Sequence, residues 1–157
     1  MPATVYVETS IFSYLTGRAT RDVVIAAHQQ LTRKWWDTQR HQFELFVSPL
    51  VVQEAAAGHT TMARRRLEIV RGLPVMAVTL EATTLAEQLI QSRSLPTKAE
   101  VNALHIGIAT VHGMEYLLTW NCKHIANARM RTQIDAVCRD RGYEPPVMCT
   151  PEELMEE

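Results

Sequence analysis

Cysteine is scarce in this chain of 157 residues, and long apolar runs are absent. The three cysteines, Cys122, Cys138 and Cys149, form no Cys-x-x-Cys pair, which argues against both a disulfide framework and a zinc site. We therefore expect a reducing, cytoplasmic environment. No apolar run approaches the ~18–20 residues that span a bilayer. The N-terminal MPATVYVETS also lacks the basic-then-apolar order of a signal peptide, so we expect a soluble protein that is not exported.

An excess of charge of one sign is missing too. Lys and Arg number 16 against 17 Asp plus Glu, a formal net charge of -1, so any contact with nucleic acid must come from a local patch. Hydrophobic residues make up 46% and charged residues 21%, which disfavours disordered and coiled-coil chains. The length favours one domain over residues 1–157. No GxGxxG motif follows the first apolar run, which argues against a dinucleotide-binding domain.

Short apolar runs alternate with segments of helical periodicity along the chain. The predicted strands are 5–8, 43–48, 74–79, 116–120 and 147–149. The predicted helices are 22–40, 49–58, 61–70, 81–93, 97–113 and 128–141, with a short terminal helix opened by Thr150. This alternation predicts an open, largely parallel α/β sheet, and such sheets bind ligands at the C-terminal ends of their strands.

Two of these helices carry more specific expectations. The helix opened by Asp22 should bury one apolar face, made of Val24, Ala27, Leu31 and Trp35. Thr97 and Glu100 match a capping box, in which the Glu100 carboxylate satisfies a backbone donor. Glu100 and Asn102 lie two apart and point about 200° away from each other on a helix, so they cannot both face one site.

Two carboxylates stand out as candidate site residues. Glu8 lies where the first apolar strand ends, at the edge of the sheet where functional residues gather; the alternative is a capping or surface glutamate. Glu54 lies among Val and Ala residues on a helix, and a buried acid there needs a cation, an arginine or a metal as partner. The alternative is an edge residue whose carboxylate reaches water.

Asn102 and Asn121 gain interest only together with the two glutamates, because each alone reads as an ordinary cap or turn residue. If the sheet is wound as predicted, the ends of the strands and helices that carry these four residues converge. Their oxygens are ligands of the type that magnesium and manganese prefer. His105 lies three residues after Asn102 on the same helix face and could approach the site, but a core or helix-packing histidine is the favoured interpretation. His124, next to Lys123, is better placed to touch a phosphate.

Four segments in this order resemble the motifs of PIN-domain nucleases, the family of many VapC-like toxin ribonucleases: VYVETSIFSYL, FVSPLVVQEAAAG, NALHIGIATVHG and EYLLTWNCKHI. The resemblance implies a three-layer α/β/α fold with a mainly parallel central sheet. It implies RNA as substrate, an antitoxin partner, a homodimer, and one or two magnesium or manganese ions that activate water for phosphodiester cleavage. The family's functional positions fall on Glu8, Thr9, Ser10, Glu54, Asn102 and Asn121. Thr9 and Ser10, with His124, become candidate substrate contacts.

The sequence departs from the family pattern at three positions. Glu8 stands where aspartate is usual, and Asn102 and Asn121 stand where acids are usual. An amide oxygen still ligates a hard cation but brings no charge. We therefore predict a metal-dependent ribonuclease in which Glu8, Glu54, Asn102 and Asn121 are the catalytic metal ligands. The alternative is a catalytically weakened PIN-like module that binds RNA or a protein partner without cleavage.

Overall fold

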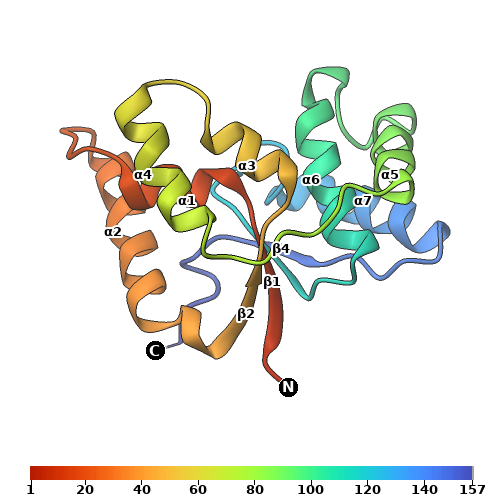
Figure 1. The fold of residues 1–157 in the computed structure, drawn as a ribbon. Helices are drawn as coiled ribbons and strands as arrows, with labels where there is room; N and C mark the ends of the chain where they lie inside the picture. The colour runs from red at the N-terminus through yellow and green to blue at the C-terminus, as the bar shows by residue number, and fades with distance from the viewer. Residues whose placement is uncertain (157) are drawn as a thin grey trace.

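The computed structural model describes residues 1–156, in which four parallel strands form the central sheet (Figure 1). The strands are β1 (Ala3–Val7), β2 (Phe43–Phe46), β3 (Tyr116–Leu118) and β4 (Val147–Cys149). Their spatial order is β2-β1-β3-β4, with every neighbouring pair parallel. The predicted strands other than 74–79 are therefore confirmed, with ends shifted by a few residues.

Helices cover both faces of this sheet. They are α1 (Thr9–Thr16), α2 (Val23–Thr38), α3 (Pro49–Ala55), α4 (Thr60–Val70), α5 (Leu80–Gln91), α6 (Glu100–Val111) and α7 (Ala128–Asp140). Single 3-10 turns occupy Arg40–Gln42 and Thr97–Ala99. In Figure 1, α1, α2 and α4 lie on one side of the strands and α5, α6 and α7 on the other. The predicted three-layer α/β/α architecture is confirmed.

The two central strands are buried because helices pack on both of their faces. Val5, Tyr6 and Val7 of β1 are fully buried, as are Leu117 and Leu118 of β3. Parallel strands in this position read as continuous apolar runs rather than alternating ones. Tyr6 is the one polar side chain in the β1 part of this core, and its hydroxyl must find a hydrogen-bond partner there.

The short helix α3 is fixed at both ends. Ser48 accepts a hydrogen bond from the Val51 amide at the start, with Pro49 in the first turn, as predicted. The helix ends at Ala55, before the predicted Gly58, which lies in the next loop with φ 86. Arg66 of α4 donates to the Ala55 carbonyl at 3.0 Å, which satisfies an acceptor that the helix end leaves free.

The buried face of α2 differs from the prediction. Val24 and Ala27 are exposed, whereas Gln29 and Thr32 are buried with Trp35. The polar side chains tolerate burial because both are hydrogen-bonded: Gln29 donates to the Arg18 carbonyl at 2.9 Å, and Thr32 accepts from the Trp120 indole at 2.7 Å. Asp22 caps the helix as predicted.

The strand predicted over 74–79 is wrong. Only Val75 pairs with the sheet, as an isolated parallel bridge to Val47. The Val47 amide donates to the Pro74 carbonyl, and the Met76 amide donates to the Val47 carbonyl. Beyond Met76 the chain leaves the sheet and leads into α5, so the apolar run marks an extended connection.

The two predicted helix caps, at Thr97 and at Thr150, have different outcomes. The one at Thr97 and Glu100 is wrong, because Thr97 belongs to a separate 3-10 turn and α6 begins at Glu100 without a side-chain cap. The box at the C-terminus does form: the Thr150 amide donates to Glu153, and the Glu153 amide donates back to the Thr150 hydroxyl. The segment after it is a hydrogen-bonded turn rather than the predicted helix.

A close approach of α6 to α5 sets the orientation of α6. A Cβ atom on Gly107 would lie 2.5 Å from the Ala82 carbonyl oxygen of α5, so the helices can meet this closely only at glycine. Because residues two apart on a helix point in nearly opposite directions, this contact directs His105 away from α5. Its ring reaches β1, where Nδ1 lies 2.7 Å from the Tyr6 hydroxyl.

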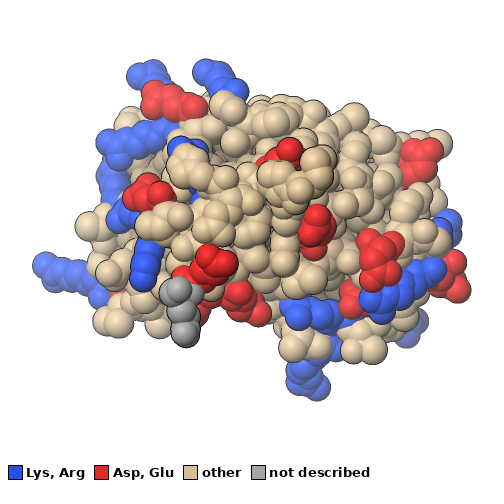
Figure 2. Space-filling model, turned by 90° about the horizontal axis from the view of Figure 1, so that it is seen from below, with Lys and Arg blue, Asp and Glu red and all other residues tan. Residues whose placement is uncertain are grey.

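The surface carries charges of both signs. Figure 2 shows the face at which the strands begin, where basic and acidic side chains are intermingled around a largely uncharged centre. This distribution agrees with the net charge of -1. Within residues 1–156, no helix combines the length and apolarity that crossing a membrane requires.

Candidate functional site

The candidate site lies where the connections of the sheet diverge. From β1 the chain proceeds to β2 on one side, whereas β3 leads to β4 on the other. Ligands of open parallel sheets bind at the C-terminal ends of the strands at such a point. Glu8 follows β1 directly and Thr119 follows β3 directly, and the Glu8 amide donates to the Leu118 carbonyl at 3.0 Å.

Glu8 is a buried carboxylate surrounded by hydrogen-bond donors. Its Oε1 accepts from the hydroxyls of Ser10 at 2.5 Å and Thr119 at 2.6 Å, and its Oε2 accepts from the Ser10 amide at 3.2 Å. The residue is only 6% exposed, so these donors offset the loss of water around the charge. Glu8 also caps α1 through its carboxylate, so the capping interpretation is confirmed, whereas a surface position is not.

Glu54 projects from α3 toward Glu8 and is half-buried. The Thr9 hydroxyl donates to its Oε1 at 2.7 Å, and Nε2 of His105 lies 2.6 Å from the same oxygen. Burial raises the pKa of the Glu54 carboxyl, but the hydrogen bond and charge of His105, with the Thr9 bond, more than offset this and lower its pKa overall. The carboxylate is therefore ionised at neutral pH. Within the described residues no donor engages its Oε2.

Glu54 is connected by hydrogen bonds to a chain of buried polar side chains. His105 is fully buried, its Nδ1 lies 2.7 Å from the Tyr6 hydroxyl, and that hydroxyl lies 2.8 Å from Ser48 Oγ. Because an ionised carboxylate only accepts, Nε2 of His105 carries hydrogen and donates to Glu54. Burial raises the pKa of Tyr6, further supported by the charges of Glu8 and Glu54, so its phenol stays protonated.

Glu8, Glu54 and His105 form the carboxylate half of the site. One ligand atom from each lies within 4.8 Å of the others, a group that could hold a metal ion. Two carboxylates this close repel each other, and a divalent cation removes that repulsion. Since Nε2 of His105 donates to Glu54, the oxygens of the two glutamates are the chemically suitable ligands. The donor set fits a hard cation such as magnesium or manganese.

Asn102, Asn121 and His124 form the amide half. Asn121 Nδ2 donates to Asn102 Oδ1 at 2.9 Å, and the His124 amide donates to Asn121 Oδ1 at 3.0 Å. Asn102 Nδ2 lies 3.4 Å from His124 Nδ1. Both amide oxygens therefore already accept a hydrogen bond from within this half.

Thr119 joins the two halves. Its hydroxyl donates to Glu8 and accepts from the Asn121 amide at 2.9 Å. The structure thus brings Glu8 and Glu54 together and brings Asn102 and Asn121 together. The sequence predicts that these four side chains converge on one point, but in the structure they form two adjacent pairs.

The predicted substrate contacts occupy different positions. The Thr9 and Ser10 hydroxyls are bound to Glu54 and Glu8, so both hold carboxylates in place. Desolvation, followed by the charges of Lys123 and Lys98, lowers the pKa of His124. His124 is therefore neutral at neutral pH, with two lysines close enough to affect it.

Sequence reasoning missed Tyr6 and Thr119 of this site, and for His105 it favoured a core role over the approach to the site that it also considered. His105 was interpreted as a core histidine, and it is buried, but its ring also binds a carboxylate of the site. The available signal was Tyr6, a hydroxyl in the middle of an otherwise apolar strand, which requires a polar partner in the core.

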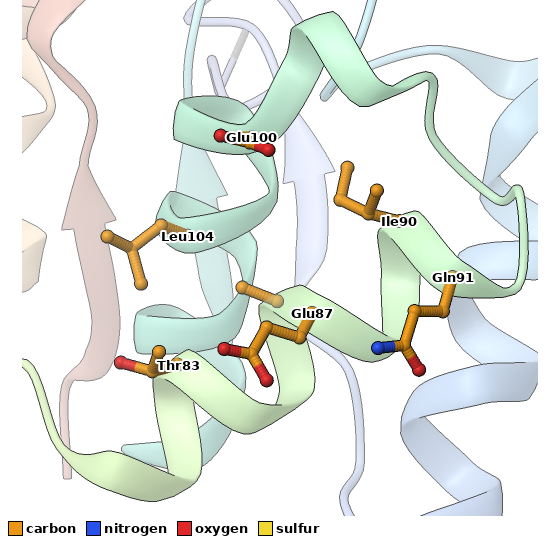
Figure 3. A pocket seen from close by; sticks show the side chains of 7 residues that line it. Thr83, Glu87, Ile90, Gln91, Glu100 and Leu104 are labelled. Atoms are coloured by element: carbon orange, nitrogen blue, oxygen red, sulfur yellow. The ribbon is translucent and has the colours of Figure 1, made fainter.

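A pocket of about 390 Å³ between α5 and α6 lies apart from these residues (Figure 3). Its lining consists of Thr83, Ala86, Glu87, Ile90, Gln91, Glu100 and Leu104. Glu100 thus faces this pocket while Asn102 belongs to the site, which confirms that the two point in different directions on α6. The pocket supplies acids useful as controls in experiments on the site.

No protein-family model matches the chain, and no curated protein matches it by sequence. Two solved structures share its fold. Mycobacterium tuberculosis VapC20, described as a toxin that cleaves the sarcin-ricin loop, aligns with a TM-score of 0.59 and 16% identity over 76% of this chain and 91% of that chain. VapBC2 from Rickettsia felis, bound to a DNA fragment from their promoter, aligns with a TM-score of 0.58 and 12% identity over 94% of this chain and 98% of that chain. The chain therefore has the α/β/α fold seen in VapC toxins.

Proposed function

We propose that this protein is a metal-dependent endoribonuclease of the PIN-domain type and the toxin-like member of a toxin–antitoxin pair. The observation that carries the proposal is the Glu8 and Glu54 carboxylate pair at the switch point of the sheet. A fold shared with an RNA-cleaving toxin supports it, because this fold and this site location suit the same chemistry.

Glu8 and Glu54 would hold a magnesium or manganese ion, with Asn102 and Asn121 completing the shell through neutral oxygens or ordered water. When bound, such an ion activates water for attack on a phosphodiester and stabilises the developing charge on the phosphate. Ser10 and Thr119 orient Glu8, while Thr9 and His105 occupy one oxygen of Glu54 and leave the other for a ligand.

In this proposal the amide half and two nearby lysines bind the substrate. Lys98 and Lys123 act on His124 electrostatically, and cations beside an acidic centre are suited to the phosphates of RNA on either side of the cleaved bond. The His124 ring, neutral in the absence of substrate, offers a hydrogen bond there.

A second candidate function is a module that binds RNA or a protein partner without cleaving. The observation in its favour is that Asn102 Oδ1 accepts from Asn121 and Asn121 Oδ1 accepts from the His124 amide, so both amide oxygens are satisfied without a cation. In such a module the two glutamates would hold no metal at millimolar concentration.

Calorimetric titration with manganese, alongside cleavage of single-stranded RNA, tests the proposal. Native protein is expected to bind manganese and cleave, and Glu8→Ala is expected to do neither. Glu87→Gln, which removes a carboxylate from the separate pocket, is the matched control and should behave as native. No manganese binding by the native chain would favour the non-cleaving module.

The proposal extends to partners and location. The resemblance to VapC-like toxins implies a homodimer and an antitoxin partner, and VapBC2 bound to DNA from its promoter is a structural neighbour. Cys122, Cys138 and Cys149 are free thiols, which suits a reducing cytoplasm. Analytical ultracentrifugation of the purified chain tests the dimer.

A further inference from the structure

Three aromatic rings from three elements meet beside the carboxylate half: Tyr14 of α1, His28 of α2, and Trp120 just after β3. The His28 ring stacks on the Trp120 ring, with centroids 3.9 Å apart and planes 12° apart. Tyr14 meets both rings edge-on, at 5.7 Å from His28 and 6.0 Å from Trp120. All three side chains are partly exposed.

This aromatic cluster is tied to the site through backbone and side-chain bonds. The Trp120 amide donates to Ser10 Oγ at 2.8 Å, and the same hydroxyl donates to Glu8. Trp120 also directly precedes Asn121 in the amide half. Its indole nitrogen donates to the buried Thr32 hydroxyl at 2.7 Å, so the orientation of the ring is fixed before any ligand arrives.

The cluster differs from the aromatic packing of the core. Trp35 is fully buried and Trp36 is 9% exposed, as rings that serve packing alone should be. In the aromatic cluster, by contrast, the Tyr14 hydroxyl and the His28 ring nitrogens have no side-chain hydrogen bond within residues 1–156. These polar edges, next to a preformed stack, are free to meet a ligand that is both flat and polar.

We propose that Tyr14, His28 and Trp120 form a stacking site for a nucleobase of single-stranded RNA that passes across the carboxylate half. A base adds to the existing His28 and Trp120 stack, and the polar edges hydrogen-bond to it. Stacking tolerates any base because every base has a π-face, so this site contributes affinity and position rather than sequence choice. The proposal rests on the proposed function for the identity of the ligand.

Tryptophan fluorescence during titration with a short oligoadenylate tests the proposal, with a chelator present so that no cleavage occurs. Of the three tryptophans, Trp120 is the accessible one, so saturable quenching is expected and should vanish in Trp120→Phe. His28→Ala should weaken binding about tenfold, within the range for loss of a stacking partner. His28→Phe keeps the flat ring but loses the ring nitrogens, so its affinity should lie between those of His28→Ala and the native chain, closer to the native chain. An abasic strand of equal length should lose most of the affinity.

Because Trp120 is anchored to Thr32, Trp120→Phe can disturb folding, and the His28 pair decides the question. Native-like affinity in His28→Ala, measured by anisotropy of a labelled strand, would overturn the stacking site. Duplex RNA that binds as tightly as the single strand would also overturn it. Stack-dependent binding with no cleavage on adding manganese would support the stacking site while contradicting the proposed nuclease. Cleavage with no effect of either His28 variant would support the nuclease and reject the stacking site.

Discussion

The carboxylate half and the amide half lie at the ends of neighbouring strands, yet they satisfy their polar atoms in different ways. Most donors to the two glutamates come from outside the carboxylate half: α1 supplies Thr9 and Ser10, and Thr119 follows β3. The exception is His105, which belongs to this half. In the amide half the bonds run among its own members. Most hydrogen bonds to the glutamates are thus donated by residues outside the carboxylate half, whereas those of the amide half form among its own members.

The difference lies in what each half lacks. Glu8 has donors on both carboxylate oxygens and Glu54 on one, but among residues 1–156 no lysine or arginine forms an ion pair with either carboxylate. Asn102 and Asn121 are uncharged, and the amide oxygen of each already accepts a hydrogen bond. A cation therefore gains most of its electrostatic stabilisation from the carboxylate half, and the amide half sets the shape of its surroundings.

Removing one charge from the carboxylate half should have the largest effect. Glu54→Gln keeps an acceptor for Thr9 and His105 but removes half of the negative charge, so manganese affinity should fall on the order of a hundredfold, below the ceiling of ~4 kcal/mol for unit charges ~4 Å apart in a dielectric of ~20. Calorimetry measures the affinity. Glu100→Gln, in the separate pocket, is the control, and an equal loss in both variants would mean that manganese binds elsewhere.

Breaking the polar chain behind Glu54 should come next. Tyr6→Phe leaves Ser48 Oγ and His105 Nδ1 without their buried partner, so the free energy of unfolding should fall by about 1–3 kcal/mol. Denaturant unfolding followed by circular dichroism measures it. Tyr143→Phe is the matched control, since Tyr143 is partly exposed. Equal stability of the two variants would show that the buried chain does not stabilise the fold.

Converting part of the amide half into a carboxylate tests the comparison from the other side. Asn102→Asp retains an acceptor for Asn121 and adds one charge next to the cation, so manganese should bind about tenfold tighter and cleavage of single-stranded RNA should rise. Calorimetry and an RNA cleavage assay measure the two effects. In a module without catalysis the added carboxylate would be uncompensated and would mainly lower the thermal midpoint. A lower midpoint with no gain in cleavage would count against the nuclease.

The fold was predictable from sequence because its signals are local. Apolar runs such as 116–120 mark buried parallel strands, and Asp22 and Ser48 mark helix starts through their caps. The errors arose where tertiary contacts decide. The run at 74–79 is as apolar as a strand but leaves the sheet after one bridge, and α2 buries Gln29 and Thr32 because partners from elsewhere bind them.

The candidate site was predictable in its members more than in its arrangement. Glu8, Glu54, Asn102 and Asn121 all lie at the predicted edge of the sheet, because a resemblance in ordered motifs carries positions along the chain. Their division into two halves was not predictable, because it depends on which side chains hydrogen-bond across separations of up to 111 residues, as between Glu8 and Thr119. Spacing along the sequence carries no information on such bonds.

The smallest effect on stability and manganese affinity is expected for substitution of His124, in contrast to His105. His124 meets Asn102 at 3.4 Å through its ring, while its bond to Asn121 comes from the backbone amide and survives substitution. His124→Ala should therefore change the free energy of unfolding by no more than about 0.5 kcal/mol and leave manganese affinity within about twofold. His105→Ala, by contrast, removes a buried ring together with its bonds to Glu54 and Tyr6, and should lower stability by several kcal/mol. Denaturant unfolding and calorimetry on both variants provide the comparison. A large loss of manganese affinity in His124→Ala would mean that the amide half, rather than the carboxylate half, governs the cation.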